Sequence, residues 1–162
     1  MPVTRNPLFV LLFGILLLAA ACTDPIEGPP CVPMTFTQAP AGGDTILTSR
    51  GLRFIEDSIG TGPVLDWCTV VSVHYDAYLT DSTKFDSSRD LGVPLRFVPG
   101  VGDLIDGFEQ GVIGMRTNGK RRLIIPPELG YGSQPLRDGS GNIIVPANST
   151  LVFDVELLLI GQ

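Results

Sequence analysis

Apolar and polar residues alternate in short stretches of the C-terminal two thirds of the chain, a pattern typical of half-buried β-strands. The clearest stretch is 69–80, in which Val71, Val73 and Tyr75 alternate with polar residues. A turn follows at 80–83, and Lys84 begins a return segment. Further strands are predicted at 52–57, 95–98, 120–125 and 150–160. One face of the last strand is expected to hold Leu151, Phe153, Val155, Leu157 and Leu159.

A spacing of three to four residues between apolar side chains predicts one helix, over residues 105–113. Ile105 and Phe108 would share its buried face, whereas Asp106 and Glu109 would face solvent. Glycines within the segment keep this helix short. Strands around one short helix indicate an α+β domain with a mostly antiparallel sheet.

The first residues of the chain have the pattern of an export signal. Arg5 precedes an apolar run of 14 residues, Leu8 to Ala21, which is shorter than the roughly 20 residues that a membrane-spanning helix needs. Three alanines lead directly to Cys22, as in a bacterial lipobox. We therefore expect residues 1–21 to be a lipoprotein signal peptide and Cys22 to be lipidated, with the protein anchored in the outer membrane facing the periplasm. An ordinary signal peptide, cleaved nearby, is the alternative.

Residues 22–50 are rich in proline, glycine and alanine and have no clear period, so they are expected to be a tether. Residues 51–162 would then form the folded domain. Besides Cys22, the chain has two cysteines, Cys31 and Cys68. Outside the cytoplasm such a pair can form a disulfide that ties the tether to the domain, and two free thiols are the alternative.

Composition and charge exclude several classes of function. The chain of 162 residues has 17 acidic and 11 basic residues, a net charge of −6, which argues against nucleic-acid partners. The chain has one histidine and no Cys-x-x-Cys pair, so neither a metal site nor a cofactor is predicted. His74 is expected to be structural, the basic run 120–122 to be a solvated face, and residues 138–142 to form a surface turn.

Aromatic residues are spread through the turn-rich region and suggest a binding cavity. With them comes Asp86, a carboxylate that the pattern places among buried neighbours. A plain hydrophobic core is the alternative. The aromatic residues are Tyr75, Phe85, Phe97, Phe108, Tyr131 and Phe153.

Six stretches of sequence, in this order, carry a more specific signal. They are VHY (73–75), KFDSSR (84–89), LIDGFEQG (104–111), GKR (119–121), PPELGYG (126–132) and IVPANSTLVFDVELL (144–158). Together they closely resemble the FKBP family of peptidyl-prolyl isomerases, the macrolide-binding immunophilins. The resemblance runs from about Gly51 to Ile160. It implies a curled antiparallel β-sheet of five to six strands wrapped around one short α-helix, with a pocket between them.

The resemblance also implies the residues of that pocket. The catalytic group would be Tyr75, Phe85, Asp86, Tyr131 and Phe153. The substrate-binding walls would be Leu95, Phe97, Leu104, Ile105 and Val145, with Phe108 as the floor. By the same resemblance, the Ile105 N–H and the Tyr131 hydroxyl would donate hydrogen bonds to the ligand. Asp86 would face the twisted carbonyl or orient Tyr131, and a purely structural hydrogen bond is its alternative role.

Two residues and one loop segment depart from the family pattern. Phe108 stands where the best-known members have Trp, and Leu95 replaces a wall aromatic. The segment 131–146 is longer than in the minimal family domain and has no histidine. These changes bear on macrolide affinity and substrate preference more than on the fold.

The implied function is prolyl isomerisation in exported polypeptides, without cofactor. The expected partners are proline-containing unfolded chains and macrolide inhibitors, and the expected oligomeric state is a monomer. Two alternatives stay open: a non-catalytic periplasmic chaperone module with the same fold, and a lipoprotein scaffold that binds its partner outside the pocket.

Overall fold

The computed structural model of the chain describes residues 30–33 and 46–161. The expected signal peptide, the Cys22 lipidation site and most of the expected tether lie outside these residues. In chain order the elements are β1 (Ile46–Leu47), β2 (Arg53–Ser58), β3 (Val71–Leu79), β4 (Lys84–Ser87), β5 (Leu95–Phe97), α1 (Asp106–Val112), β6 (Lys120–Ile125), the 3₁₀ helix η1 (Pro127–Leu129), β7 (Leu136–Arg137), β8 (Ile143–Val145) and β9 (Leu151–Ile160).

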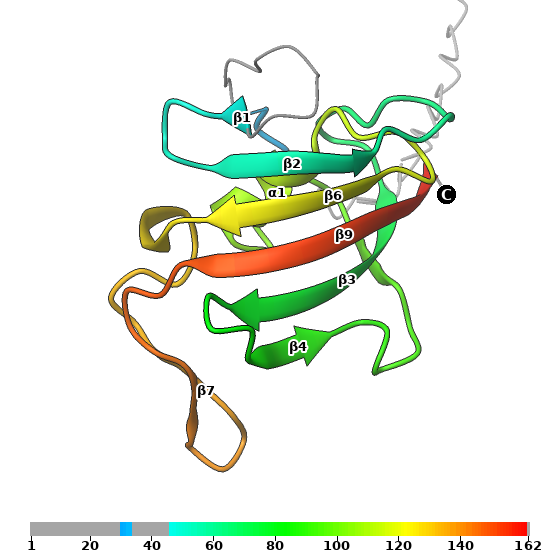
Figure 1. Cartoon of the computed structure of the whole chain (residues 1–162). Helices are drawn as coiled ribbons and strands as arrows, with labels where there is room; N and C mark the ends of the chain where they lie inside the picture. Colours follow the sequence, from blue (N-terminus) through cyan, green and yellow to red (C-terminus); the bar gives the residue numbers. More distant parts are fainter. Residues whose placement is uncertain (1–29, 34–45, 162) are drawn as a thin grey trace, which may run out of the picture.

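The main sheet has the order β1-β2-β6-β9-β3-β4, and β5 also pairs with β3. Every pair of neighbouring strands is antiparallel. The sheet curves around α1, which lies against one of its faces (Figure 1). This confirms the predicted α+β fold. The described part of the sheet has seven strands rather than five or six, because Ile46–Leu47, within the expected tether, pairs with β2.

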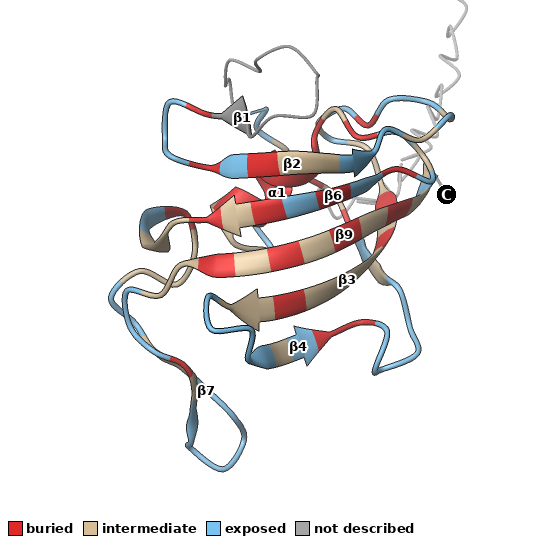
Figure 2. Ribbon diagram, in the orientation of Figure 1, coloured by how far each residue is buried: buried red, intermediate tan, exposed pale blue. Residues whose placement is uncertain are grey.

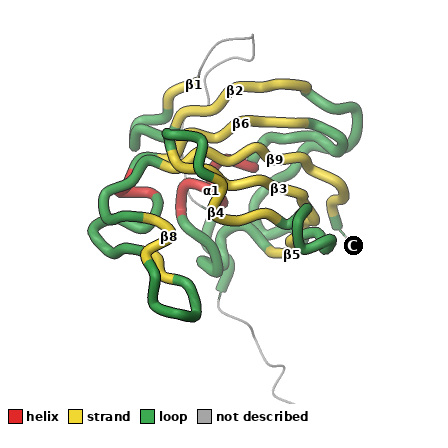
Figure 3. Tube along the Cα trace, turned by 60° about the horizontal axis from the view of Figure 1, so that its bottom comes forward, coloured by secondary structure: helices red, strands yellow, loops and turns green. Residues whose placement is uncertain are grey.

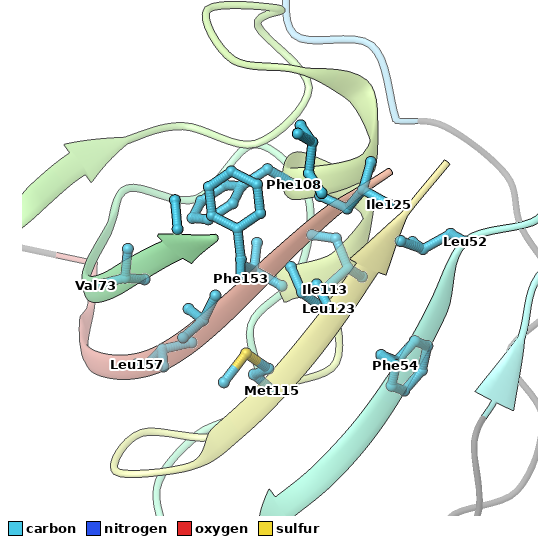
Figure 4. Close-up of a cluster of buried hydrophobic side chains, with 14 of the residues drawn as sticks. Leu52, Phe54, Val73, Phe108, Ile113, Met115, Leu123, Ile125, Phe153 and Leu157 are labelled. Atoms are coloured by element: carbon cyan, nitrogen blue, oxygen red, sulfur yellow. The ribbon is translucent and has the colours of Figure 1, made fainter. Parts of the chain in front are cut away.

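Burial alternates along the central strands, as the hydrophobic pattern predicted (Figure 2). The side chains that point toward α1, among them Leu123, Phe153 and Leu157, form the core shown in Figure 4. Leu159 is an exception, because it is 47% exposed. The register of β3 and β9 shifts so that Val73 pairs with Leu157 and Ser72 with Leu159. The extra residue between them reverses the alternation, so the prediction for Leu159 was wrong.

The predicted helix is confirmed as α1, which packs closely on β6. Gly107 and Gly111 are one turn apart and face Ile125 and Leu123 of that strand. A Cβ atom built on Gly111 would lie 2.5 Å from a Leu123 methyl carbon. These glycines therefore allow the helix backbone to approach the sheet, in addition to limiting helix length.

Glu109 and Arg121 are buried, contrary to the sequence expectations, and each is 1% exposed. Arg121 donates to the Gly111 and Ile113 carbonyls at the end of α1, at 2.6 and 2.9 Å, and forms an ion pair with Glu56. Its guanidinium also lies over the Phe54 ring, 4.2 Å from the centroid. These contacts compensate for the burial of the cation, which supplies donors to carbonyls that the helix end leaves unpaired.

The N-terminal segment 30–33 is attached to the domain in two ways. Cys31 and Cys68 form a disulfide with a Cα–Cα distance of 5.6 Å. The Val32 N–H donates to the Gly100 carbonyl at 2.9 Å. Neither helix of the described residues is long and apolar enough to cross a membrane.

The segment 131–146 contains the β7–β8 hairpin, which extends away from the main sheet (Figures 1 and 3). Asp138 holds its tip by accepting from the Ser140 and Asn142 N–H groups at 2.9 Å each. The predicted surface turn at 138–142 is therefore confirmed.

Candidate active site

A cavity of about 190 Å³ lies where α1, the inner face of the sheet and two loops meet. The chain brings most of the expected site residues to its walls, although they are far apart in sequence. The lining residues are Tyr75, Asp86, Leu95, Asp103, Leu104, Ile105, Phe108, Tyr131 and Phe153.

Phe108 from α1 lies at the centre of the aromatic residues below the cavity. Its ring centroid is 5.2 Å from that of Phe153, 5.7 Å from that of Tyr75 and 5.7 Å from that of Phe97. These spacings, with tilted and edge-to-face rings, are those of stabilising aromatic pairs. Because Phe108 is only 2% exposed, neighbouring rings fix its position before any ligand arrives.

A β-bulge places Asp86 beside the cavity. Ala77 pairs with Asp86 and the next residue, Tyr78, pairs with Lys84, so Phe85 is an extra residue in β4. At such a bulge two successive side chains can reach the same face of a sheet. Asp86 thus reaches Tyr75, while Phe85 packs edge-on against Phe153 at 6.0 Å.

Both oxygens of Asp86 accept hydrogen bonds. The Tyr75 hydroxyl donates to one oxygen at 2.6 Å, and the Ser87 N–H donates to the other at 2.8 Å. Burial, followed by this contact with Asp86, raises the pKa of Tyr75 well above its usual range. Asp86 is exposed, not buried as its sequence context suggested, and its hydrogen bond goes to Tyr75 and not to Tyr131.

Tyr131 also lines the cavity and lies two residues after the end of η1. The turn that carries it is fixed by Gly130 and Gly132, whose N–H groups donate to the Pro127 carbonyl. Burial, with a smaller effect of the Asp86 charge, raises the pKa of Tyr131. Its hydroxyl has no hydrogen-bond partner among the described residues, so it can donate to a ligand.

The loop before α1 supplies the third wall, and Glu109 holds it in place. One Glu109 oxygen accepts from the Gly100 N–H at 2.8 Å and the other from the Leu104 N–H at 3.2 Å. The next backbone N–H, that of Ile105, has no partner in the part of the chain that the structure describes. The Ile105 N–H and the Tyr131 hydroxyl are therefore unpaired donors, within the described residues, on two residues that line the cavity with the apolar Phe108.

Three of the expected site residues do not line the cavity. Phe97 packs against Phe108 from behind, and Phe85 packs against Phe153. Val145 is fully buried in the core. These side chains support the walls, and we expect them to act on a ligand only through the residues they contact.

Comparison with known proteins identifies the family. A model of the FKBP-type peptidyl-prolyl cis-trans isomerase domain matches residues 68–158, more than half of the chain. The chain belongs to this family. It is therefore an enzyme of the FKBP type, as the resemblance in its sequence implied.

Relatives in this family are similar over most of their own length. FK506-binding protein 2 of Dictyostelium discoideum is 50% identical over 100 residues, which cover 57% of this chain and 71% of the relative. An FK506-binding protein of Neisseria meningitidis serogroup C is 48% identical over 92 residues, covering 57% and 80%. Among solved structures, the crystal structure of AtFKBP13 has a TM-score of 0.67 at 36% identity, covering 72% of this chain and 98% of that one.

Sequence reasoning missed two acidic residues of this FKBP-type site. Asp103 lines the cavity, and its one sequence signal is that it immediately precedes Leu104 and Ile105. The apolar spacing of residues 105–113 predicts a solvent-facing Glu109, whereas the structure buries it. Among the described residues, no cluster of His, Cys, Asp or Glu is arranged to hold a metal ion.

Proposed function

We propose that the cavity binds the proline of an Xaa-Pro segment in an exported polypeptide and accelerates rotation about that bond. The observation that carries this proposal is an apolar cavity, floored by Phe108, with the unpaired Ile105 N–H and Tyr131 hydroxyl at its walls. The apolar floor suits a pyrrolidine ring, and the two donors suit the carbonyls on either side of it.

The chemistry needs no bond cleavage, because only the partial double bond of the amide has to be overcome. Its rotational barrier is about 18–20 kcal/mol. A site lowers the barrier when it binds the twisted amide better than either planar form. Removing water from the prolyl carbonyl disfavours the charge-separated resonance form and so weakens the double-bond character. A thousandfold acceleration requires about 4 kcal/mol of such differential binding.

We assign Asp86 and Tyr75 to the polar side of this cavity. Asp86 presents a carboxylate beside the carbonyl that rotates, and the Tyr75 hydroxyl and Ser87 N–H hold that carboxylate in position. Its two hydrogen bonds fix its geometry, so little reorganisation is needed as the amide twists.

We further propose that the enzyme works outside the cytoplasm as a monomer, anchored through a lipid on Cys22. The signal-like residues 1–21 and the Cys31–Cys68 disulfide support export. One relative, 40% identical over 114 residues, is named as a lumenal chloroplast protein of Arabidopsis thaliana. Anchoring in the outer membrane, the tether at 22–50 and the domain at 51–162 remain part of this proposal. It is tested by labelling with a radioactive fatty acid, which should depend on Cys22.

Macrolides are the second class of ligand proposed for the cavity. Several relatives are named as FK506-binding proteins. Phe108 is a smaller floor, and Leu95 a smaller wall, than the aromatic residues they replace, so we expect weaker macrolide binding than in the best-known family members. Isothermal titration calorimetry with FK506 measures this affinity.

The activity itself is tested with a proline peptide in a protease-coupled assay of the full chain in mild detergent. We expect acceleration above the blank at micromolar enzyme, and inhibition by excess macrolide. Asp86→Leu and Phe108→Ala should both reduce kcat/KM. No acceleration at micromolar enzyme, together with suppression of aggregation that survives these two substitutions, would support the chaperone alternative instead.

A further inference from the structure

Asp103 is an acidic residue at the edge of the cavity that none of the described residues neutralises. It is exposed and lines the cavity beside Leu104 and Ile105. It makes no hydrogen bond or ion pair with residues 30–33 or 46–161. The nearby carboxylates differ in this respect: Asp86 accepts two hydrogen bonds, and Asp106 is paired with Arg50 at 3.3 Å.

The backbone around Asp103 is anchored on both sides. Glu109 accepts from the N–H of Gly100 before it and from that of Leu104 after it. Because Glu109 is 1% exposed and belongs to α1, these bonds connect the loop to the core. The backbone of Asp103 is therefore held two residues before Ile105, whose N–H is one of the two donors assigned to the substrate.

The charges that line the cavity are all negative. Asp86 and Asp103 are its charged residues, and the remaining lining residues are apolar or tyrosine. A cationic group that enters beside the proline would meet an unpaired carboxylate and no competing Lys or Arg of the lining. An anionic group would meet uncompensated repulsion from the same carboxylate.

We propose that Asp103 is a specificity-determining residue that favours substrates with Lys or Arg directly next to the proline. This inference rests on the proposed isomerase function and adds a substrate class to it. Because Asp103 is exposed, the contact should have the strength of a solvent-exposed ion pair, which corresponds to about a two- to fivefold preference in kcat/KM. Salt should reduce the preference, since such pairs are screened.

The test compares peptides in which the residue next to proline is Lys, Leu or Glu. One series varies the residue before proline and a second varies the residue after it. Catalysed cis–trans exchange is measured by NMR, without protease, using the full chain in mild detergent at low and high salt. In at least one series we expect the catalysed exchange rate at low salt to decrease in the order Lys, Leu, Glu.

The variants separate this contact from general effects on the fold. In Asp103→Asn the ratio of Lys to Leu should fall to near one, whatever the absolute activity, and Asp103→Glu should restore it. The matched control is Asp106→Asn, which removes a carboxylate that pairs with Arg50 and does not line the cavity. Its ratio should match that of the original chain.

Three results would overturn the inference. Equal rates for Lys and Leu peptides in both series would show that Asp103 does not select. A preference that persists in Asp103→Asn would assign it to another residue. If the chain accelerates the Leu peptide, either result leaves the isomerase function intact. No acceleration of any peptide would overturn that function and the inference together.

Discussion

At the residue scale, the site combines groups that are satisfied within the protein with groups that are not. The Tyr75 hydroxyl donates a hydrogen bond to Asp86, and both Glu109 carboxylate oxygens accept hydrogen bonds from backbone N–H groups. The Tyr131 hydroxyl and the Ile105 N–H have no partner in the described part of the chain. The motif around Tyr131 and Ile105 could be read from the sequence. The pairing of Asp86 with Tyr75 could not, because it depends on the bulge at Phe85.

Removing the Tyr131 hydroxyl tests its assignment as a donor to substrate. Tyr131→Phe should lower kcat/KM about two- to tenfold, the value of one neutral hydrogen bond, and should barely change stability. Protease-coupled kinetics and urea unfolding measure the two effects. Tyr78→Phe is the matched control, because Tyr78 faces the outer side of the sheet with Arg122 and Asp154. An equal loss of activity in both variants would contradict the assignment.

The raised pKa values of Tyr75 and Tyr131 predict the alkaline behaviour of the protein. Both hydroxyls stay protonated as the pH passes about 10, where an ordinary tyrosine ionises, so kcat/KM should not fall there. Stability should behave differently. The unfolded chain loses these protons first, so their contribution is complete below about pH 10 and is lost as the pH rises toward the folded-state pKa values.

Unfolding midpoints at a series of alkaline pH values check this prediction. Tyr131→Phe should lose part of the alkaline destabilisation, because it lacks one of the two groups. An unfolding midpoint that increases as the pH is raised beyond about 10 would show that Tyr75 and Tyr131 are not buried as described. Absorbance of these tyrosines that titrates as in a free peptide would show the same.

At the scale of elements, strand alternation and the helical spacing of 105–113 predicted most of the sheet and α1. The prediction was wrong for two charged residues, because Glu109 and Arg121 were expected to face solvent and are buried. Sequence patterns assign charges to the surface because burying an unpaired charge is costly. Here the loop before α1 and the helix end leave backbone groups unpaired, and these charges satisfy them. Only the three-dimensional arrangement shows that requirement.

The buried cation is expected to be important for stability, whereas its exposed neighbour is not. Arg121→Met should destabilise the protein by about 3–5 kcal/mol, because Glu56 and the carbonyls of Gly111 and Ile113 lose their donor. Arg122→Met is the matched control. Arg122 is about half exposed and pairs with Asp154, so its loss should cost about 0–1 kcal/mol. Urea unfolding measures both, and similar losses would contradict the distinction.

At the scale of the whole molecule, the motifs in order were sufficient to predict the family and the curled sheet, and the structure and relatives confirm both. The extra strand β1 was not predicted, because two residues carry no alternation that a pattern can detect. The sequence left the state of Cys31 and Cys68 open for a similar reason. Pairing across 37 residues depends on how segment 30–33 docks beside Gly100.

The disulfide should make global stability depend on redox conditions. Closing a loop of this length stabilises a protein by about 2–4 kcal/mol. Reductant should therefore lower the unfolding midpoint of the original chain. Reductant should not change the unfolding midpoint of a variant that carries both Cys31→Ser and Cys68→Ser. The midpoint of this variant should match that of the reduced original chain. An original chain insensitive to reductant would show that the cysteines are unpaired in solution.

The central claim is that the cavity floored by Phe108 catalyses rotation about Xaa-Pro bonds. Exchange NMR on a Leu-Pro peptide, with a small fraction of the full chain added, tests it most directly. Uncatalysed exchange takes tens of seconds or longer and gives no cross-peaks between cis and trans signals. We predict that the protein produces these cross-peaks and that Phe108→Ala abolishes or strongly weakens them. Absence of cross-peaks with the original chain, or equal cross-peaks with folded Phe108→Ala, would contradict the claim.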